Sequence, residues 1–245
     1  MIGKYYNMTA SQFVEYLGFS KYVAGRGNKA KKNTKLGWDI NGDRPAISSF
    51  VQEYADFGIE HEKHALKFYA DHMGKKGKDF NFILSNQKSF ELHNFYSTKN
   101  GVISLSATPD GIQSDRCIEI KCGKKGKDVY SIKEIVDRYY PQIQGQLLVL
   151  TKLGYKPSKT HFVNWSYNTQ QIYEILPNQQ YFEYLEEHLK DYAKHLLSEK
   201  DFTEDSPSFS DDITKQLNLI HEEKKDEEWN YVWYCQSSYI RSRQN

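Results

Sequence analysis

Apolar residues recur every three or four positions in three long segments of the chain, and this spacing predicts amphipathic helices. The three segments are residues 50–73, 132–153 and 179–198. Gly74 ends the first segment, and Pro141 inside the second predicts a kink or a helix start there. A shorter helix is predicted from Thr9, which suits an N-cap, to Gly18, which suits a helix end.

Apolar and polar residues alternate in the segments between these helices, and this period of two predicts strands. Residues 80–105 alternate around turn signals, which predicts antiparallel strands in a hairpin or meander. Three further strands are predicted at residues 116–122, 160–167 and 171–176. The order helix, strands, helix, strands, helix predicts one α/β sandwich in which a mixed central β-sheet is flanked by α-helices.

The chain is long enough for one large domain with an appendage, and its charge marks a boundary between them. Residues 201–228 hold ten acids against three lysines, and an aromatic run follows at 229–235. We therefore assign residues 1–200 to the main domain and residues 201–245 to an acidic connector and aromatic C-terminal extension. The net charge of +1 averages this tail with a basic front half, where residues 21–44 hold seven Lys and Arg against two Asp.

Cysteine content and hydropathy indicate the compartment. The three cysteines are an odd number without the close spacing of metal ligands, which indicates a reducing compartment and argues against disulfides or structural zinc. No window approaches eighteen consecutive apolar residues, and the N-terminus lacks the apolar core of a signal peptide. We therefore expect an intracellular protein with no membrane partner.

Two short motifs carry the candidate chemistry, and neither is specific by itself. Residues 108–111, Thr-Pro-Asp-Gly, form a turn signature, and residues 118–121, Ile-Glu-Ile-Lys, are typical of an alternating strand with a solvated charged face. Together they are more informative, because alternation places Glu119 and Lys121 on one face of the strand. A hairpin before that strand would bring Asp110 beside Glu119.

This grouping suits a magnesium site for phosphodiester hydrolysis, because magnesium is bound by one or two carboxylates together with waters and phosphate oxygens. Asp110 and Glu119 supply the carboxylates, and the backbone carbonyl of Ile120 is a further candidate ligand. Lys121 is suited to orient or help deprotonate the attacking water and to stabilise charge on the phosphate. One or two Mg²⁺ ions, or Mn²⁺ in their place, are the expected cofactor.

Four blocks of the sequence resemble the lambda exonuclease and YqaJ-type viral recombinase family of PD-(D/E)xK nucleases, and they follow in the family's order. Asp110 with Glu119-Ile120-Lys121 resembles the PD-(D/E)xK signature, and Pro109 completes its first half. The other blocks are Thr9-Ala10-Ser11, the Gly-x-x-x-Glu-x-x-Ala pattern from Gly58 to Ala65, and the Gln-x-Gln helix in residues 139–147, which holds Gln142, Gln144 and Gln146. The resemblance spans residues 9–198 and implies a restriction-endonuclease-like core.

The resemblance also implies roles for individual residues. Asp110 and Glu119 would be the principal metal ligands, and Glu62 would bind metal directly or through water. Lys121 would be the catalytic lysine, and Gln142 would assist near the lysine and the phosphate. Contacts to DNA phosphates are implied for Ser11, Lys4 and Gln144, although the family places an arginine in the region where this chain offers only Lys4.

At the level of function, the resemblance implies a magnesium-dependent exonuclease that acts from duplex DNA ends with 5′→3′ polarity and leaves single strands for recombination. The implied partners are double-stranded DNA ends, a single-strand annealing protein and further copies of the chain in a homo-trimer. The implied location is the host cytoplasm, or the nucleus for a eukaryotic virus. An endonuclease of the same fold and a non-catalytic DNA-end-binding protein remain alternatives.

Three other patterns in the sequence suggest different chemistry or contacts. His61 and His64 are three residues apart, whereas the zinc-protease helix needs histidines four apart, so we expect both to face solvent or DNA. The three cysteines cannot supply the four thiolates of an iron–sulfur cluster, so we expect packing roles for Cys117 and Cys122. The basic segment at residues 21–35 is a candidate contact for DNA phosphates.

Overall fold

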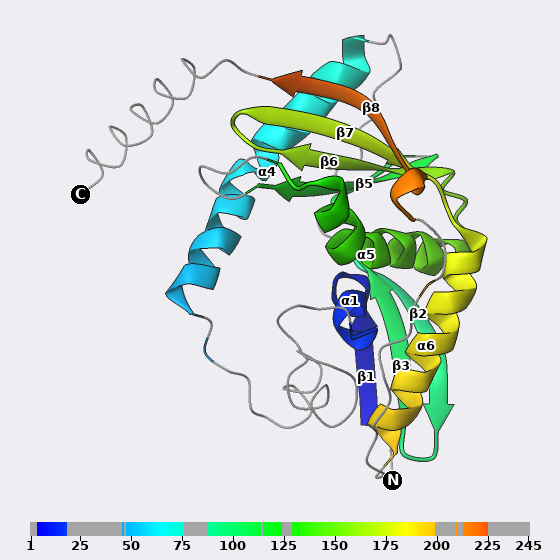
Figure 1. Cartoon of the computed structure of the whole chain (residues 1–245). Coiled ribbons are helices and arrows are strands. Elements are labelled where there is room, and N and C mark those ends of the chain that lie inside the picture. The colour runs from blue at the N-terminus through cyan, green and yellow to red at the C-terminus, as the bar shows by residue number, and fades with distance from the viewer. Residues whose placement is uncertain are drawn as a thin grey trace.

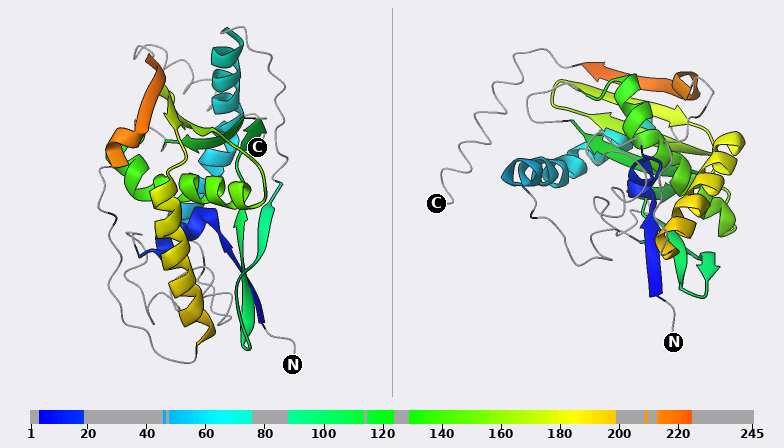
Figure 2. Two further views of the ribbon diagram at one scale, coloured as in Figure 1. Left: turned by 90° about the vertical axis from the view of Figure 1, so that its right-hand side faces the viewer. Right: turned by 60° about the horizontal axis from the view of Figure 1, so that its bottom comes forward.

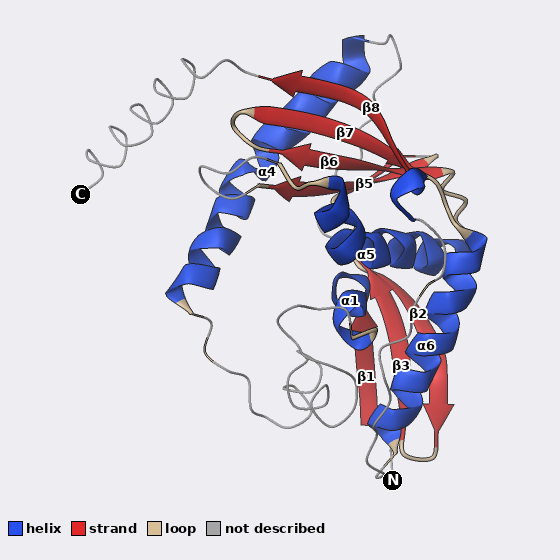
Figure 3. Ribbon diagram, in the orientation of Figure 1, coloured by secondary structure: helices blue, strands red, loops and turns tan. Residues whose placement is uncertain are grey.

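The computed structural model describes residues 4–18, 46, 48–75, 88–113, 115–123, 129–198, 209 and 213–224. Its helices and strands, distinguished in Figure 3, are β1 Lys4–Thr9, η1 Ala10–Gln12, α1 Phe13–Tyr16, α4 Ser49–Lys75, β2 Phe90–Thr98, β3 Gly101–Ala107, β4 Gly111–Gln113, β5 Arg116–Cys122, α5 Ile132–Lys152, β6 Lys159–Trp165, β7 Thr169–Ile175, α6 Gln179–Leu197, η2 Ile213–Gln216 and β8 Leu217–Lys224. The whole basic segment 21–44 and the whole aromatic run 229–235 lie outside the described residues.

The strands form two sheets, whereas the sequence predicted one. The five-stranded sheet has the order β4-β5-β6-β7-β8, and the three-stranded sheet has the order β1-β3-β2. Both are mixed, because β5 pairs with β6 in parallel and β1 pairs with β3 in parallel, while the other neighbours are antiparallel. The predicted α/β class, with mixed sheet flanked by helices, is confirmed. Figure 1 shows the five-stranded sheet above and the three-stranded sheet below.

Helix α5 lies between the two sheets (Figures 1 and 2). Ser131 begins it with a capping box, in which its side chain accepts from the Glu134 N–H and the Glu134 carboxylate accepts from the Ser131 N–H. Every residue from Tyr140 to Leu150 is buried, as expected for a helix covered on all sides. The helix runs through Pro141, so this proline does not mark a helix start.

The larger hydrophobic core joins α5 to the three-stranded sheet, to α6 and to one face of the five-stranded sheet. Leu147 and Leu150 of α5 share it with Leu105 of β3, Phe162 of β6 and Leu189 of α6. Because one helix contributes to the packing of both sheets, the described part of the chain is built around α5.

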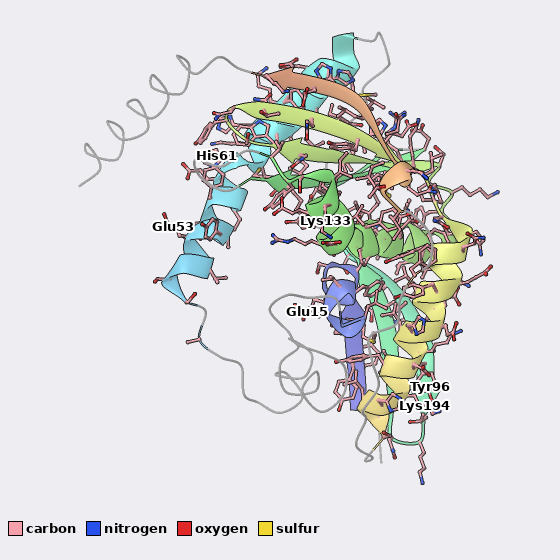
Figure 4. All side chains as sticks on the ribbon, in the orientation of Figure 1. Glu15, Glu53, His61, Tyr96, Lys133 and Lys194 are labelled. Carbon is pink, nitrogen blue, oxygen red and sulfur yellow. The ribbon has the colours of Figure 1, made fainter. Side chains whose placement is uncertain are left out.

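Helix α4 covers the opposite face of the five-stranded sheet. Its Ala65 and Tyr69 pack with Ile118 and Ile120 of β5 in a second core. The first half of α4 extends beyond the sheet, and Figure 4 shows Glu53 on that part and His61 closer to the strand ends. None of the helices in the described ranges is long and apolar enough to cross a membrane.

Most predicted elements are present, and the additions are β1, β4 and β8. The predicted helices correspond to η1 with α1, α4, α5 and α6, and the strand predicted at residues 116–122 is β5. Of the strands predicted within residues 80–105, β2 and β3 are described, and residues 80–87 lie outside the described part. The segment assigned to the acidic connector contains β8, which pairs with β7 at the edge of the five-stranded sheet.

Candidate active site

The β4–β5 hairpin brings Asp110 next to β5, as the sequence predicted. Gly111 pairs with Ile118, so Asp110 lies one residue beyond the last paired position. Its Oδ2 atom accepts a hydrogen bond from the backbone N–H of Ile120 at 2.7 Å. The Asp110 side chain therefore continues the pairing that the backbone of β4 no longer provides, and this fixes the carboxylate beside β5.

Glu119 is the most enclosed acid of the site, with 1% of its surface exposed. Its Oε1 atom accepts from Lys121 Nζ at 2.5 Å and from Gln142 Nε2 at 2.6 Å. Its Oε2 atom accepts from Gln146 Nε2 at 2.7 Å. A buried carboxylate is costly unless it is paired and hydrogen-bonded, and these three donors meet that requirement.

Lys121 emerges on the same face of β5 as Glu119 and points towards α5. Its ammonium lies 5.4 Å from the ring centre of Tyr139 on α5, within the range of a cation–π contact. Burial by itself lowers the pKa of Lys121, but the negative charges of Glu119 and Asp110 outweigh burial and raise the pKa above its ordinary value. Lys121 is therefore a cation at neutral pH.

The Asp110 carboxyl has a strongly shifted pKa. Burial, followed by the negative charge of Glu119, raises the pKa of Asp110 to about 8, while Lys121 and the Ile120 N–H oppose this rise. The charge of Glu62 on α4 also raises the pKa of Asp110, which puts Glu62 within electrostatic reach of the site. The pKa of Asp110 thus reflects its burial and the crowding of acids around it, which favour its protonated form until a cation is bound.

The donor set fits a magnesium ion, judged by its chemistry. Glu119 accepts three hydrogen bonds and Asp110 accepts one, whereas a carboxylate offers about four acceptor positions, so each retains capacity for a cation. No three Asp, Glu, His or Cys side chains within the described ranges converge as a complete metal cluster. Magnesium needs only one or two carboxylates, because waters and phosphate oxygens complete its shell.

The Ile120 carbonyl is the fourth predicted ligand. Ile120 lies beyond the β4 pairing, and its N–H is bound by Asp110 on that side of β5. The N–H and C=O of one strand residue point to the same edge of the strand. The Ile120 carbonyl consequently points to the edge on which Asp110 lies.

The three residues predicted to contact DNA phosphates lie in different environments. Ser11 lies in η1, is exposed, and has its Oγ atom 3.2 Å from Thr9 Oγ1. Lys4 begins β1, and its side chain lies outside the described part. Gln144 is fully buried, donates to the Leu176 carbonyl and accepts from the Asn178 N–H, so its amide ties α5 to the start of α6. This placement supports a structural role for Gln144 instead of a phosphate contact.

Gln146 belongs to the site, although sequence reasoning gave this residue of the Gln-x-Gln helix no role. It donates to Glu119, as Gln142 does, whereas Gln144 points elsewhere. The helical period could have linked Gln146 to Gln142, because residues four apart share a helix face and residues two apart do not. The Gln-x-Gln pattern drew attention to Gln144, but the spacing of four joins Gln142 to Gln146.

His61 and the two cysteines Cys117 and Cys122 have structural roles. His61 is buried: Nδ1 donates to the Phe57 carbonyl at 2.8 Å and Nε2 pairs with the Tyr167 hydroxyl, so the expectation that it faces solvent or DNA was wrong. Cys117 and Cys122 are free thiols packed in the cores, and burial raises the pKa of each to about 12, which keeps both neutral.

Comparison with known proteins supplies the family. A profile of the YqaJ-like viral recombinase domain matches residues 4–155, which is more than half of the chain and includes Asp110, Glu119, Lys121 and both glutamines. A comparison with curated proteins gives no match. Among solved structures, a crystal structure of SSO0001 overlays with a TM-score of 0.43 and 14% identity over 79% of this chain and 78% of the other, a likeness too low to establish a shared fold. The chain therefore belongs to the YqaJ-like viral recombinase domain family, which implies a nuclease that acts in recombination.

Proposed function

We propose that the protein is a magnesium-dependent exonuclease that hydrolyses phosphodiester bonds from the ends of duplex DNA. The observation that carries this proposal is the grouping of Asp110, Glu119 and Lys121 where the β4–β5 hairpin meets α5. Two carboxylates supply hard oxygen ligands for a divalent cation, and an adjacent ammonium attracts a phosphate.

The roles of the residues follow from their contacts. Asp110, Glu119 and the Ile120 carbonyl would hold one or two magnesium ions, and Glu62 would bind directly or through water. Magnesium, or manganese in its place, supplies the polarisation of the phosphate and the acidification of a bound water. Glu119 is held in place by its three donors, which orient its carboxylate towards the site.

Lys121 is assigned to charge stabilisation. Its raised pKa means that it holds its proton at neutral pH, so it is poorly suited to deprotonate the attacking water. A charged ammonium beside the scissile phosphate favours the transition state, in which negative charge builds on the phosphate oxygens. The Tyr139 ring beneath the ammonium holds it in place without neutralising it.

The substrate and the polarity are proposed from the resemblance of the sequence to lambda-exonuclease-type nucleases. Cleavage that proceeds 5′→3′ from a duplex end would leave single strands for recombination, received by a single-strand annealing protein. The exposed Ser11, together with Lys4, is proposed to hold a phosphate at the DNA end. A homo-trimer around the duplex is proposed as the assembly.

The test is cleavage of linear duplex DNA with magnesium by the wild type, Glu119→Ala and Lys121→Ala. Each variant is expected to lose about a thousandfold in rate, because charge and metal contributions are worth several kcal/mol and about 1.4 kcal/mol corresponds to tenfold. Lys133→Ala is the matched control, since Lys133 is exposed and pairs only with Asp137 among the described residues. Undiminished cleavage by either site variant would overturn the assignment.

A second substrate separates the alternatives. Covalently closed circular DNA offers no ends, so an exonuclease leaves it intact, and appreciable cutting would indicate an endonuclease. Calorimetry that detected salt-dependent DNA binding without magnesium binding would indicate a DNA-end-binding protein without catalysis.

A further inference from the structure

Two glutamines of α5 hold the two oxygens of one carboxylate. Gln142 Nε2 donates to Glu119 Oε1 at 2.6 Å, and Gln146 Nε2 donates to Glu119 Oε2 at 2.7 Å. The glutamines are four residues apart and therefore lie one above the other on a single face of the helix. Each oxygen of Glu119 thus receives an amide from the same rigid element.

The orientation of the Gln146 amide is determined by Glu119. An ionised carboxylate only accepts hydrogen bonds, so Gln146 must turn its NH₂ group towards it. The Oε1 atom of Gln146 is then buried and has no hydrogen-bond partner within the described part of the chain. Gln146 as a whole is 1% exposed.

Packing alone does not explain a glutamine at this position. A buried acceptor without a partner is unfavourable, and an apolar side chain of similar size, such as Met, would fill the space without it. The neighbouring Leu147, Leu148 and Val149 show that this part of α5 accommodates apolar residues. The contact that requires an amide at residue 146 is the one to Glu119.

We propose that Gln146 is a positioning residue that fixes the plane of the Glu119 carboxylate for a divalent cation. The inference rests on the proposed function, in which Glu119 is a metal ligand. The terminal torsion of a glutamate is broad, so a donor on one oxygen alone leaves the carboxylate free to turn. Separate donors on both oxygens, from one helix face, remove that freedom.

Gln146 also limits the hold of Lys121 on the carboxylate. The Lys121 ammonium binds Oε1, and the amide of Gln146 occupies Oε2. Without that amide, the ammonium gains access to both oxygens and competes with the cation for them. Loss of Gln146 therefore weakens cation binding in two ways. The Glu119 carboxylate becomes free to rotate, and the Lys121 ammonium competes with the cation for both oxygens.

The experiment compares Gln146→Met and Gln146→Asn with the wild type. Met keeps the volume without the donor, and Asn keeps an amide whose reach is shorter by one methylene. Tyr140→Phe is the matched control, because it also removes a buried polar group from α5, at a hydroxyl that contacts Asn178 and lies away from Glu119. All four proteins are examined for Mn²⁺ binding by calorimetry, for kcat and KM on linear duplex DNA, and for thermal melting.

We expect both Gln146 variants to bind Mn²⁺ about 10- to 100-fold more weakly and to lose kcat by a similar factor, while KM for DNA stays close to the wild type. Both variants should also melt at a lower temperature, because the buried Glu119 carboxylate loses a donor. Tyr140→Phe should match the wild type in Mn²⁺ binding. A structural role alone would lower the melting temperature without changing Mn²⁺ affinity, and that result would overturn the inference. If Gln146→Met does not fold, Gln146→Asn decides the question by the same readouts.

The outcome is separable from that of the proposed function. A wild-type protein that binds Mn²⁺ but cuts no DNA would overturn the exonuclease assignment, while the calorimetric comparison of Gln146 variants still tests the positioning role. Equal Mn²⁺ affinity in the wild type and in both Gln146 variants would overturn the positioning role, even if the wild type cuts DNA.

Discussion

Helix α5 closely approaches the N-terminal segment at Gly145, and replacing Gly145 with alanine tests that packing. A Cβ atom at Gly145 would lie 2.5 Å from two ring carbons of Phe13 and 3.4 Å from Ala10 Cβ. Carbon atoms in contact are normally about 3.5–4.0 Å apart, so the ring or the helix must move by about 1 Å. Phe13 is fully buried, so its ring cannot turn into solvent.

Two opposing contributions set the expected size of the effect. Overpacking of a closed core costs about 1–3 kcal/mol, and the enclosure of Phe13 puts Gly145→Ala in the upper part of that range. Alanine regains about 1 kcal/mol over glycine in a helix interior. The expected net loss in the free energy of unfolding is about 1–2 kcal/mol.

Gly58→Ala in α4 is the matched control, because a Cβ at Gly58 meets none of the described atoms within 4 Å. It receives the helix benefit without the clash and should gain about 0.5–1 kcal/mol. Urea unfolding followed by circular dichroism measures both variants, with unchanged m-values expected. Equal stability of the two variants would refute the close approach of α5 to Phe13.

Two further predictions concern charge and capping. Burial raises the pKa of Asp110 to about 8 in the folded state, against 3.8 ordinarily. Without divalent cations, the folded state therefore binds one more proton than the unfolded state between these two values. The free energy of unfolding of the wild type should then decrease as the pH rises from about 4 to about 8. Asp110→Asn should abolish this decline in urea unfolding, and parallel pH profiles would contradict the reasoning. Ser131→Ala removes the capping box of α5 and should cost about 1 kcal/mol in thermal melts, whereas Ser131→Asp should retain most of the stability.

Local sequence patterns predicted the elements that are locally determined. Helices α4, α5 and α6 have strong periods and clear ends, and β5 alternates between a core face and the site face. Of the three missed strands, β4 is a short arm of a local hairpin with β5, whereas β1 and β8 depend on distant partners. The β1 strand pairs in parallel with β3, which begins at Gly101, and β8 is an acidic segment whose pairing with β7 outweighs its composition. The division into two sheets follows from these pairings and is equally non-local.

The sequence predicted the candidate site to about the same extent as it predicted the fold. Asp110, Glu119 and Lys121 could be grouped because a hairpin and strand alternation are local rules, and the structure brings them together. The environment could not be predicted, because the raised pKa of Asp110 depends on burial by elements far along the chain. Gln146 lies in the matched segment but received no role, because the Gln-x-Gln motif pairs residues two apart, whereas a helix face joins residues four apart.

The residues between Gln142 and Gln146 explain how the fold and the site depend on each other. An α-helix turns about 100° per residue, so neighbouring residues of a buried helix face different elements. Gln142 and Gln146 face Glu119 on β5, Gln144 faces the connection from β7 to α6, and Gly145 faces Phe13 in α1. A single turn of α5 therefore sets the carboxylate of the site, the start of α6 and the segment that carries Ser11. Because each contact uses a different direction from one helix, none of these elements can shift along α5 without disturbing the others.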